Sequence, residues 1–361
     1  MRTAQCLASV ALLLALASAA LGDPTYSLTD CGPAPAGSGF GTIGGGTYLN
    51  DSGEIVTGFN AAGLVRPLYW SSSTGQVQFG VFGEEHVQPY GITNGGTVYG
   101  NFNLLPGFQA FSWTIGGGIA NFNPIVGAVT ILDSRVDTSD TFYFRVGTSK
   151  YLWQAGSYHA VTPEPAAGNT TNASGDLASA GSHLGHTEAL RWVEGTGTSW
   201  LGVPAGYTDS FSIDINDSGV VAGFGRNESY YDEAAIFAPD GTITKLGTLG
   251  GSQPFSDAFG INNSQWVVGR TTSSADDYFH GFVWSSEFGM LDLQTHLDSS
   301  GAGWTIYDAE KINENGQIVG FGTLDGTTYN LVLLTPVIVP EPATLSLLSL
   351  AALALLRRRS A

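Results

Sequence analysis

The fold of this chain is decided by a stretch that recurs along it, most clearly at Ile215-Asn216-Asp217-Ser218-Gly219-Val220-Val221-Ala222-Gly223. An apolar residue is followed by Asn, a small polar turn, Gly and a β-branched run. Asn and Asp hydrogen-bond their own backbone and Gly accepts a positive φ, so the polar part predicts a tight turn. The Val-rich part favours a strand. The stretch therefore predicts a short hairpin.

This unit recurs along the chain at starts 49, 92, 132, 171, 215, 261 and 312. The copies at Leu49, Ile261 and Ile312 are close, those at Ile92 and Thr171 are looser, and Leu132-Asp133-Ser134 is the weakest. Internal repeats with a period of 39 to 51 residues are typical of propeller blades or other repeat folds.

A second landmark supports the repeats. Short apolar strands end 21 to 23 residues after each start, and their last residues are Trp70, Trp113, Trp153, Trp192, Phe237, Trp284 and Leu334. Each unit holds about four short strands, so we expect an all-β fold, a seven-bladed β-propeller. The segment Leu28-Thr29-Asp30-Cys31-Gly32 matches Ile243-Thr244-Lys245-Leu246-Gly247. The N-terminal strand is thus predicted to close the last blade and to bury Cys31 as a small apolar residue.

Composition limits the partners. Only 12% of the 361 residues are charged and the formal net charge is −18, which excludes nucleic acid as a ligand because such binding needs Lys and Arg. The acidic surplus is explained by solubility outside the cell, or alternatively by attraction of divalent cations or cationic ligands.

The two ends predict addressing signals. Residues 1–22 combine Arg2, a short apolar run and the small-x-small site Ala17-Ser18-Ala19, the pattern of a secretory signal peptide. The propeller is expected over residues 23–336. Residues 337–361 form a tail with Pro340-Glu341-Pro342, an apolar stretch over 343–356 and the cluster Arg357-Arg358-Arg359. As a helix, the 14 apolar residues would span only roughly 21 Å, a weak membrane anchor.

This tail resembles the PEP-CTERM sorting signal, in which these three parts occur in the same order. The resemblance implies an exported protein of a Gram-negative bacterium, placed at the cell surface or in the extracellular matrix. It also implies that Pro340, Glu341 and Pro342 are read by an exosortase-type processing enzyme after transient insertion of the tail as a transmembrane helix, with the Arg cluster on the cytoplasmic side. Pro163-Glu164-Pro165 has no apolar helix after it, so we expect a surface turn there.

The repeats resemble the HAF family of bacterial extracellular repeats, named for a His-Ala-Phe strand motif. His280-Gly281-Phe282 nearly matches it, whereas the third and seventh units depart widely. The resemblance covers about residues 26–336. It implies the fold and an extracellular setting, with no particular reaction.

Candidate sites for chemistry are weak. His183 and His186 are the only close His pair, and on one strand their spacing would place the rings on opposite faces, which argues against zinc. Asp276-Asp277, Asp232-Glu233, Asp217 and Glu314 lie in predicted turns; calcium there is possible in principle, but no Asp-Gly calcium loop is present. We therefore expect no cofactor and assign no catalytic residue.

Two functions remain open. The first is a non-enzymatic surface or matrix protein whose propeller binds exopolysaccharide or other surface proteins. The alternative is a polysaccharide-active enzyme with paired carboxylates at the mouth of the central channel. Tyr230, Tyr231 and Tyr278 lie outside the repeated aromatic position and are the better candidates for sugar contact.

Overall fold

The structure, a computed structural model, describes residues 23–33, 46–61, 64–80, 86–104, 107–125, 130–132, 135–161 and 170–337. The predicted signal segment 1–22, the turn at 163–165 and the sorting residues Pro340, Glu341, Pro342, Arg357, Arg358 and Arg359 lie outside these ranges. No helix among the described residues is long and apolar enough to cross a membrane. The apolar tail stretch 343–356 lies outside the described residues.

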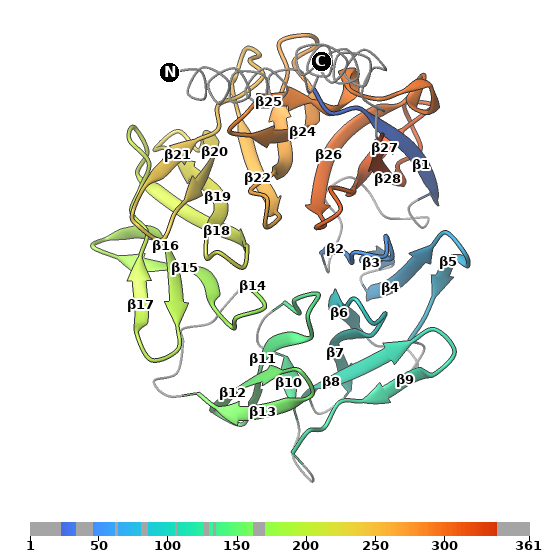
Figure 1. Cartoon of the computed structure of the whole chain (residues 1–361), viewed down its shortest axis with the longest axis vertical. Helices are drawn as coiled ribbons and strands as arrows, with labels where there is room; N and C mark the ends of the chain where they lie inside the picture. Colours follow the sequence, from blue (N-terminus) through green and yellow to red (C-terminus); the bar gives the residue numbers. More distant parts are fainter. Residues whose placement is uncertain are drawn as a thin grey trace, which may run out of the picture.

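Seven four-stranded antiparallel sheets account for the strands of the described residues, and they follow one another around a central axis in chain order (Figure 1). This confirms the predicted seven-bladed β-propeller. Blades 1 to 4 consist of β2 (Thr47–Leu49), β3 (Ile55–Ala61), β4 (Leu64–Ser71) and β5 (Gly75–Gln78); β6 (Val87–Ile92), β7 (Val98–Leu104), β8 (Gly107–Thr114) and β9 (Gly118–Asn121); β10 (Ile131–Leu132), β11 (Thr141–Val146), β12 (Ser149–Gln154) and β13 (Ser157–Ala160); and β14 (Thr170–Thr171), β15 (Leu177–His183), β16 (His186–Val193) and β17 (Gly197–Trp200).

Blades 5 to 7 complete the ring. They consist of β18 (Asp209–Ile215), β19 (Val221–Arg226), β20 (Asp232–Phe237) and β21 (Ile243–Lys245); β22 (Ser256–Ile261), β23 (Val267–Thr272), β24 (Phe279–Ser285) and β25 (Gly289–Asp292); and β26 (Thr305–Ile312), β27 (Ile318–Thr323), β28 (Asn330–Pro336) and β1 (Tyr26–Pro33). Two short 3-10 helices, η1 (Leu293–Thr295) and η2 (Ser299–Gly301), connect blades 6 and 7. The first strand of each blade lies nearest the axis (Figure 1).

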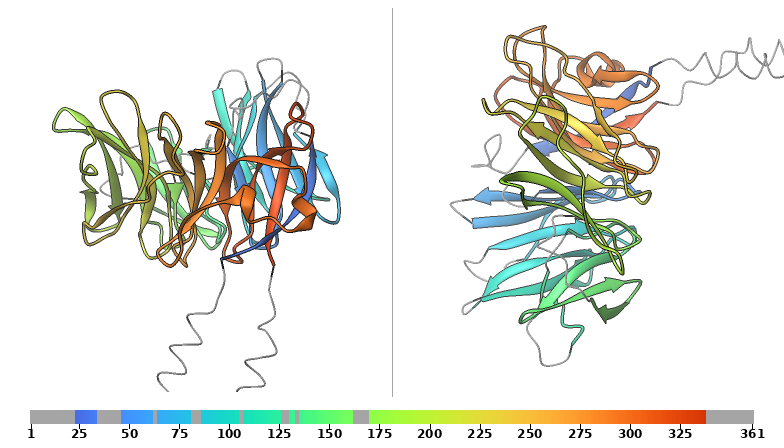
Figure 2. Two further views of the ribbon diagram at one scale, coloured as in Figure 1. Left: turned by 90° about the horizontal axis from the view of Figure 1, so that it is seen from above. Right: turned by 90° about the vertical axis from the view of Figure 1, so that its left-hand side faces the viewer.

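The predicted closure is confirmed. β1 pairs antiparallel with β28, with Leu28 opposite Leu334 and Thr29 opposite Leu333. Figure 2 shows the two strands side by side. Cys31 is buried between blades 7 and 1, and this burial raises the pKa of its thiol. One blade is thus built from both ends of the described chain, which removes a free sheet edge.

The core is divided among the interfaces between blades. Seven clusters of buried apolar residues lie in the described chain, one at each junction of successive blades, including the junction of blade 7 with blade 1. Trp70, Trp192 and Trp284 lie opposite the first residues of β3, β15 and β23 and are at most 8% exposed. The repeated aromatic position is therefore core, because each blade packs on both faces.

Blade 3 departs from the predicted register. Its turn has Asp137 as the first residue: Asp137 donates its N–H to Thr141, and its carboxylate accepts from the N–H of Ser139. Phe142, five residues after Asp137, pairs with Trp153 as Ile55 pairs with Trp70. The predicted turn, with Asp133 in the position of the Asn, is four residues too early. The spacing of 21 residues in this unit was a coincidence.

Candidate functional site at the channel mouth

The Asn of each repeat builds its own turn. In blade 5, Oδ1 of Asn216 accepts the N–H of Ser218 at 3.1 Å and of Val220 at 3.0 Å, while Gly219 has a φ of 75°. Asn50, Asn172 and Asn313 make the same pair of bonds. This is why the repeat favours Asn first and, three residues later, a residue with a positive φ. Gly fills that position in five of the seven turns, while Asp140 and Gln265 fill it in blades 3 and 6 with φ of 66° and 59°.

The same Asn side chains also link the blades. Each Nδ2 donates to the backbone carbonyl oxygen of the first turn residue in the next blade, at 2.9 to 3.2 Å, running Asn172 to Asn216, Asn216 to Asn262, Asn262 to Asn313, Asn313 to Asn50, and Asn50 to Thr93. All five Asn residues are at most 4% exposed. We call these residues the Asn ring. A buried amide whose oxygen and nitrogen are both hydrogen-bonded stabilises the fold, whereas a buried amide without partners lowers its stability.

A second layer of bonds runs above the Asn ring, at the residue that follows each Asn. The backbone N–H of this residue in one blade donates to a side-chain oxygen of the equivalent residue in the next blade. These bonds run from Asp51 to Asn94, Ala173 to Asp217, Asp217 to Asn263, Asn263 to Glu314, and Glu314 to Asp51. The carboxylates of Asp51, Asp217 and Glu314 at the mouth therefore hold neighbouring blades together. Acceptance from a backbone N–H satisfies a carboxylate in its charged form.

The Asn ring is interrupted at blades 2 and 3, because Thr93 of blade 2 and Asp137 of blade 3 have no side-chain amide to donate. Burial raises the pKa of Asp137 to about 6, and the nearby charge of Asp217 adds to this shift. The junction with blade 4 is bonded differently: the hydroxyl of Tyr143 donates to the carbonyl oxygen of Gly175 at 2.6 Å, and Gln154 donates to that of Ala173.

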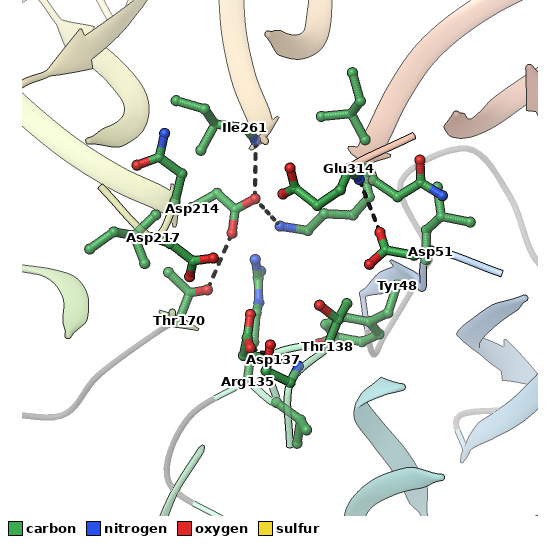
Figure 3. Close-up of a pocket in the computed structure, with 18 of the residues that line it drawn as sticks. Tyr48, Asp51, Arg135, Asp137, Thr138, Thr170, Asp214, Asp217, Ile261 and Glu314 are labelled. Carbon is green, nitrogen blue, oxygen red and sulfur yellow. Dashed lines mark hydrogen bonds and ion pairs between the residues drawn. The ribbon is translucent and has the colours of Figure 1, made fainter. Parts of the chain in front are cut away.

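The channel below the Asn ring carries charge. Two residues before each turn residue, the first strands place Tyr48, Gly91, Arg135, Thr170, Asp214, Gly260 and Lys311. Lys311 Nζ lies 2.7 Å from Asp214 Oδ2, so blades 7 and 5 are joined across blade 6 (Figure 3). Gly260 of blade 6 allows this approach: a Cβ there would lie 3.1 Å from the Cα of Lys311.

Asp214 is held on three sides. Besides Lys311, it accepts the hydroxyl of Thr170 at 3.3 Å and the N–H of Ile261 at 3.2 Å (Figure 3). Arg135 donates to the carbonyl oxygen of Ile213 at 3.3 Å. Burial lowers the pKa of Lys311, and the charge of Asp214 opposes that shift. The pair is a buried ion pair with supporting hydrogen bonds, which belongs to the scaffold of the channel.

A cavity of about 150 Å³ lies between the mouth and this ion pair. Besides Asp214, its lining brings together Asp51, Asp137, Asp217 and Glu314 (Figure 3), four further carboxylates from four blades. This is the acidic channel mouth required by the alternative function. Three of the four carboxylates accept inter-blade bonds. Burial raises the pKa of Asp137 to about 6 and also raises the pKa of Glu314.

The other acidic candidates are engaged elsewhere. Asp232 binds Arg226 at 2.6 Å, Glu233 binds Lys245 at 3.0 Å, and Asp276 binds His280 at 3.1 Å. Among the described residues, no group of three or more His, Cys, Asp or Glu side chains is arranged to hold a metal ion. Asp232, Glu233 and Asp276 therefore each pair with a basic side chain of their own blade.

The His pair was placed wrongly on a single strand. Leu184 and Gly185, with φ of 50° and 91°, make a two-residue turn, so His183 and His186 lie directly opposite each other on adjacent strands. Cross-strand partners share a face. Both rings contact the carboxylate of Glu188, at 2.5 Å and 3.3 Å, and the ring of His183 stacks on Trp200.

Sequence reasoning did not find Tyr48, Arg135 or Lys311. A signal for them exists, because they occupy one equivalent position in the seven repeats. Lys311 and Arg135 are also charged residues among apolar strand neighbours. Finding Arg135 needs the correct register of blade 3, which the sequence does not provide.

No protein-family model matches the chain, and no curated protein matches it. Among solved structures, virginiamycin B lyase from Staphylococcus aureus aligns with a TM-score of 0.50 and 11% identity over 86% of this chain and 100% of that chain. A streptogramin B lyase aligns with a TM-score of 0.48 and 10% identity over 87% of this chain and 98% of that chain. At such low identity the likeness is one of fold alone: the chain is a seven-bladed β-propeller.

Proposed function

We propose that this protein is an exported, non-enzymatic propeller of the surface or matrix of a Gram-negative bacterium, where it binds exopolysaccharide or other surface proteins. One observation carries the non-enzymatic part. Of the four carboxylates that line the channel mouth, Asp51, Asp217 and Glu314 accept backbone N–H groups from the adjacent blade. Carboxylates committed to closing the ring are poorly suited to proton transfer on a substrate.

The setting is proposed from the ends of the sequence. The pattern of residues 1–22 supports export, and Pro340-Glu341-Pro342 with Arg357-Arg358-Arg359 supports processing by an exosortase-type enzyme. The test is expression of the full chain in a host with such an enzyme, beside a Glu341→Gln variant. We expect a shorter, surface-released product from the original chain and retention of the unprocessed variant in the membrane fraction. Equal processing of both would contradict the assignment.

The alternative, a polysaccharide-active enzyme, is favoured by a single observation, the pKa of about 6 at Asp137 beside three other carboxylates. A group with such a pKa is suited to general acid or base catalysis near neutral pH. The two functions are separated by incubating the purified protein with neutral and uronate polysaccharides. The proposal expects retention of the polymer without new reducing ends or unsaturated products. Turnover that is lost in Asp137→Asn would establish the enzyme instead.

A further inference from the structure

A second hollow lies on the opposite face of the molecule from the Asn ring. Because the strands of each blade are antiparallel, the loop between β19 and β20, the loop between β23 and β24, and the connection from β21 to β22 all lie at that other end. Together they enclose a groove of about 430 Å³ between blades 5 and 6. We call it the aromatic groove; it is lined by Ser229, Tyr230, Tyr231, Ser252, Gln253, Phe255, Thr272, Asp277 and Phe279.

Tyr230 occupies a position that disfavours it. The loop over Asn227–Tyr231 is a copy of the repeat turn: Oδ1 of Asn227 accepts the N–H of Ser229 at 2.9 Å and of Tyr231 at 3.1 Å. The residue three places after the Asn is Gly219 in the blade 5 turn, and here it is Tyr230, with a φ of 62°. A side chain with a Cβ is disfavoured in this left-handed conformation. The side chain is nevertheless 77% exposed, so packing does not compensate for that cost.

Asp277 on the facing loop has the same unusual conformation, with a φ of 62°. Its Oδ1 accepts the N–H of Ser252 at 2.6 Å, which joins the two loops of blade 6. A carboxylate has further acceptor sites beyond this single bond. Residues held in sparsely populated backbone regions concentrate at ligand-binding sites, and two of them line this one groove.

Two phenylalanine rings form the apolar part of the groove wall. Phe255 and Phe279 meet edge to face, with ring centroids 5.4 Å apart. The guanidinium of Arg270 lies 5.5 Å and 4.9 Å from their ring centroids and is paired with Asp257 at 3.0 Å. These two cation–π contacts help to hold the rings of Phe255 and Phe279 in place.

The lining favours a neutral, hydroxyl-rich ligand. It contains four aromatic rings, three hydroxyl side chains, one amide and one carboxylate, and no Lys or Arg. Anionic ligands would meet Asp277 without a neutralising cation. Aromatic faces suit the C–H faces of sugar rings, while hydroxyl, amide and carboxylate groups bond sugar hydroxyls. The volume falls in the range of about 300–1,000 Å³ usual for small-ligand sites.

We infer that the aromatic groove binds a short segment of a neutral polysaccharide, with Tyr230 stacking on a sugar ring and Asp277 accepting from sugar hydroxyls. This rests on the proposed function, because it assumes that the propeller binds glycan rather than cleaving it. The inference adds to that function a binding site, the aromatic groove, and a ligand class, neutral polysaccharide.

The test variant is Tyr230→Gly, since Gly restores the residue that this turn prefers and so removes the ring without harming the fold. Its matched control is Leu184→Gly. Leu184 is also left-handed, with a φ of 50°, is 84% exposed, and lies in the equivalent loop of blade 4. The full chain and both variants are run by affinity electrophoresis in gels containing galactomannan, hydroxyethyl cellulose, dextran or, as anionic comparison, alginate.

We expect retardation by at least one neutral polymer and none by alginate. Tyr230→Gly should raise the apparent Kd by roughly fivefold or more, the loss usual for an aromatic anchor. The melting temperature of this variant should stay equal to that of the original chain or rise. Leu184→Gly should bind as the original chain does. Retardation that persists in Tyr230→Gly, or that occurs with alginate alone, would overturn the groove assignment and leave the binding function intact. Absence of retardation by every neutral polymer would overturn the assignment of the groove to neutral polysaccharide, and would leave binding to other surface proteins untouched.

Discussion

Asp137 is the one acidic residue among the seven that begin the repeat turns. Five of the other six turns begin with Asn, and Thr93 begins the turn of blade 2. The folded carboxyl keeps its proton up to a pH of about 6, whereas the ordinary value is 3.8. The folded state therefore loses stability as the pH rises from about 4 through 6, and the loss is complete above that window.

Replacing Asp137 with Asn removes this penalty, because the amide carries no charge at any of these pH values. We expect Asp137→Asn to raise stability at pH 7.5 by about 1–3 kcal/mol and to make little difference at pH 4. Urea unfolding at the two pH values measures the effect. A gain of equal size at both pH values would show that the charge of Asp137 is not its source.

Lys311 and Asp214 form an ion pair whose two charges are enclosed by the channel. Lys311→Met leaves the carboxylate of Asp214 without its cation, and we expect a loss of about 3 kcal/mol. The double variant Asp214→Asn with Lys311→Met should recover at least half of that loss, since the amide still accepts from Ile261. Chemical unfolding measures the free energy of unfolding of the single and double variants beside that of the original chain. A double variant no more stable than the single one would show that the pair is not coupled.

The Asn turn is the element that repeats, and it has two separable functions. Oδ1 forms the turn and Nδ2 connects the blades. Asn216→Asp keeps the acceptor and loses the donor to Asn262. We expect it to cost about 1–3 kcal/mol, because the buried carbonyl of Asn262 loses its partner. Asn227→Asp is the control, since that turn uses the same Oδ1 bonds at the surface of the aromatic groove, and thermal unfolding should show little change. Equal losses in the two variants would assign the whole effect to the turn.

The same element explains how far sequence reasoning reaches. The turn is local, so its pattern identifies the strands, the aromatic core positions and the clasp of Leu28 on Leu334. It fails where local chemistry changes, as in blade 3, where Asp137 begins the turn and Asp133 mimicked it. It also fails for contacts made across blades. Neither the bond from Asn216 to Asn262 nor the ion pair of Lys311 with Asp214 follows from spacing, because both depend on how the ring curves.

At the scale of the whole molecule, stability depends on the blade made from both ends. Cys31 reports on it, because its thiol is 3% exposed between blades 7 and 1. In a Cys6→Ser background, we expect Leu28→Asp to raise the rate of Cys31 modification by a thiol reagent at least about tenfold under native conditions, since a buried charge opens the clasp. Leu184→Asp, at an exposed hairpin tip, is the matched control and should leave the rate unchanged. A slow rate in both would show that β1 is held independently of Leu28.

The pairing of β1 with β28 also sets when the ring can close during synthesis. A ribosome makes β1 first and β28 last, about 300 residues apart in the described chain. Throughout synthesis the opening strand has no partner, so the circle stays incomplete until the final repeat emerges. A product cut short before that point carries two unmatched edges, and proteases can distinguish it from the finished protein.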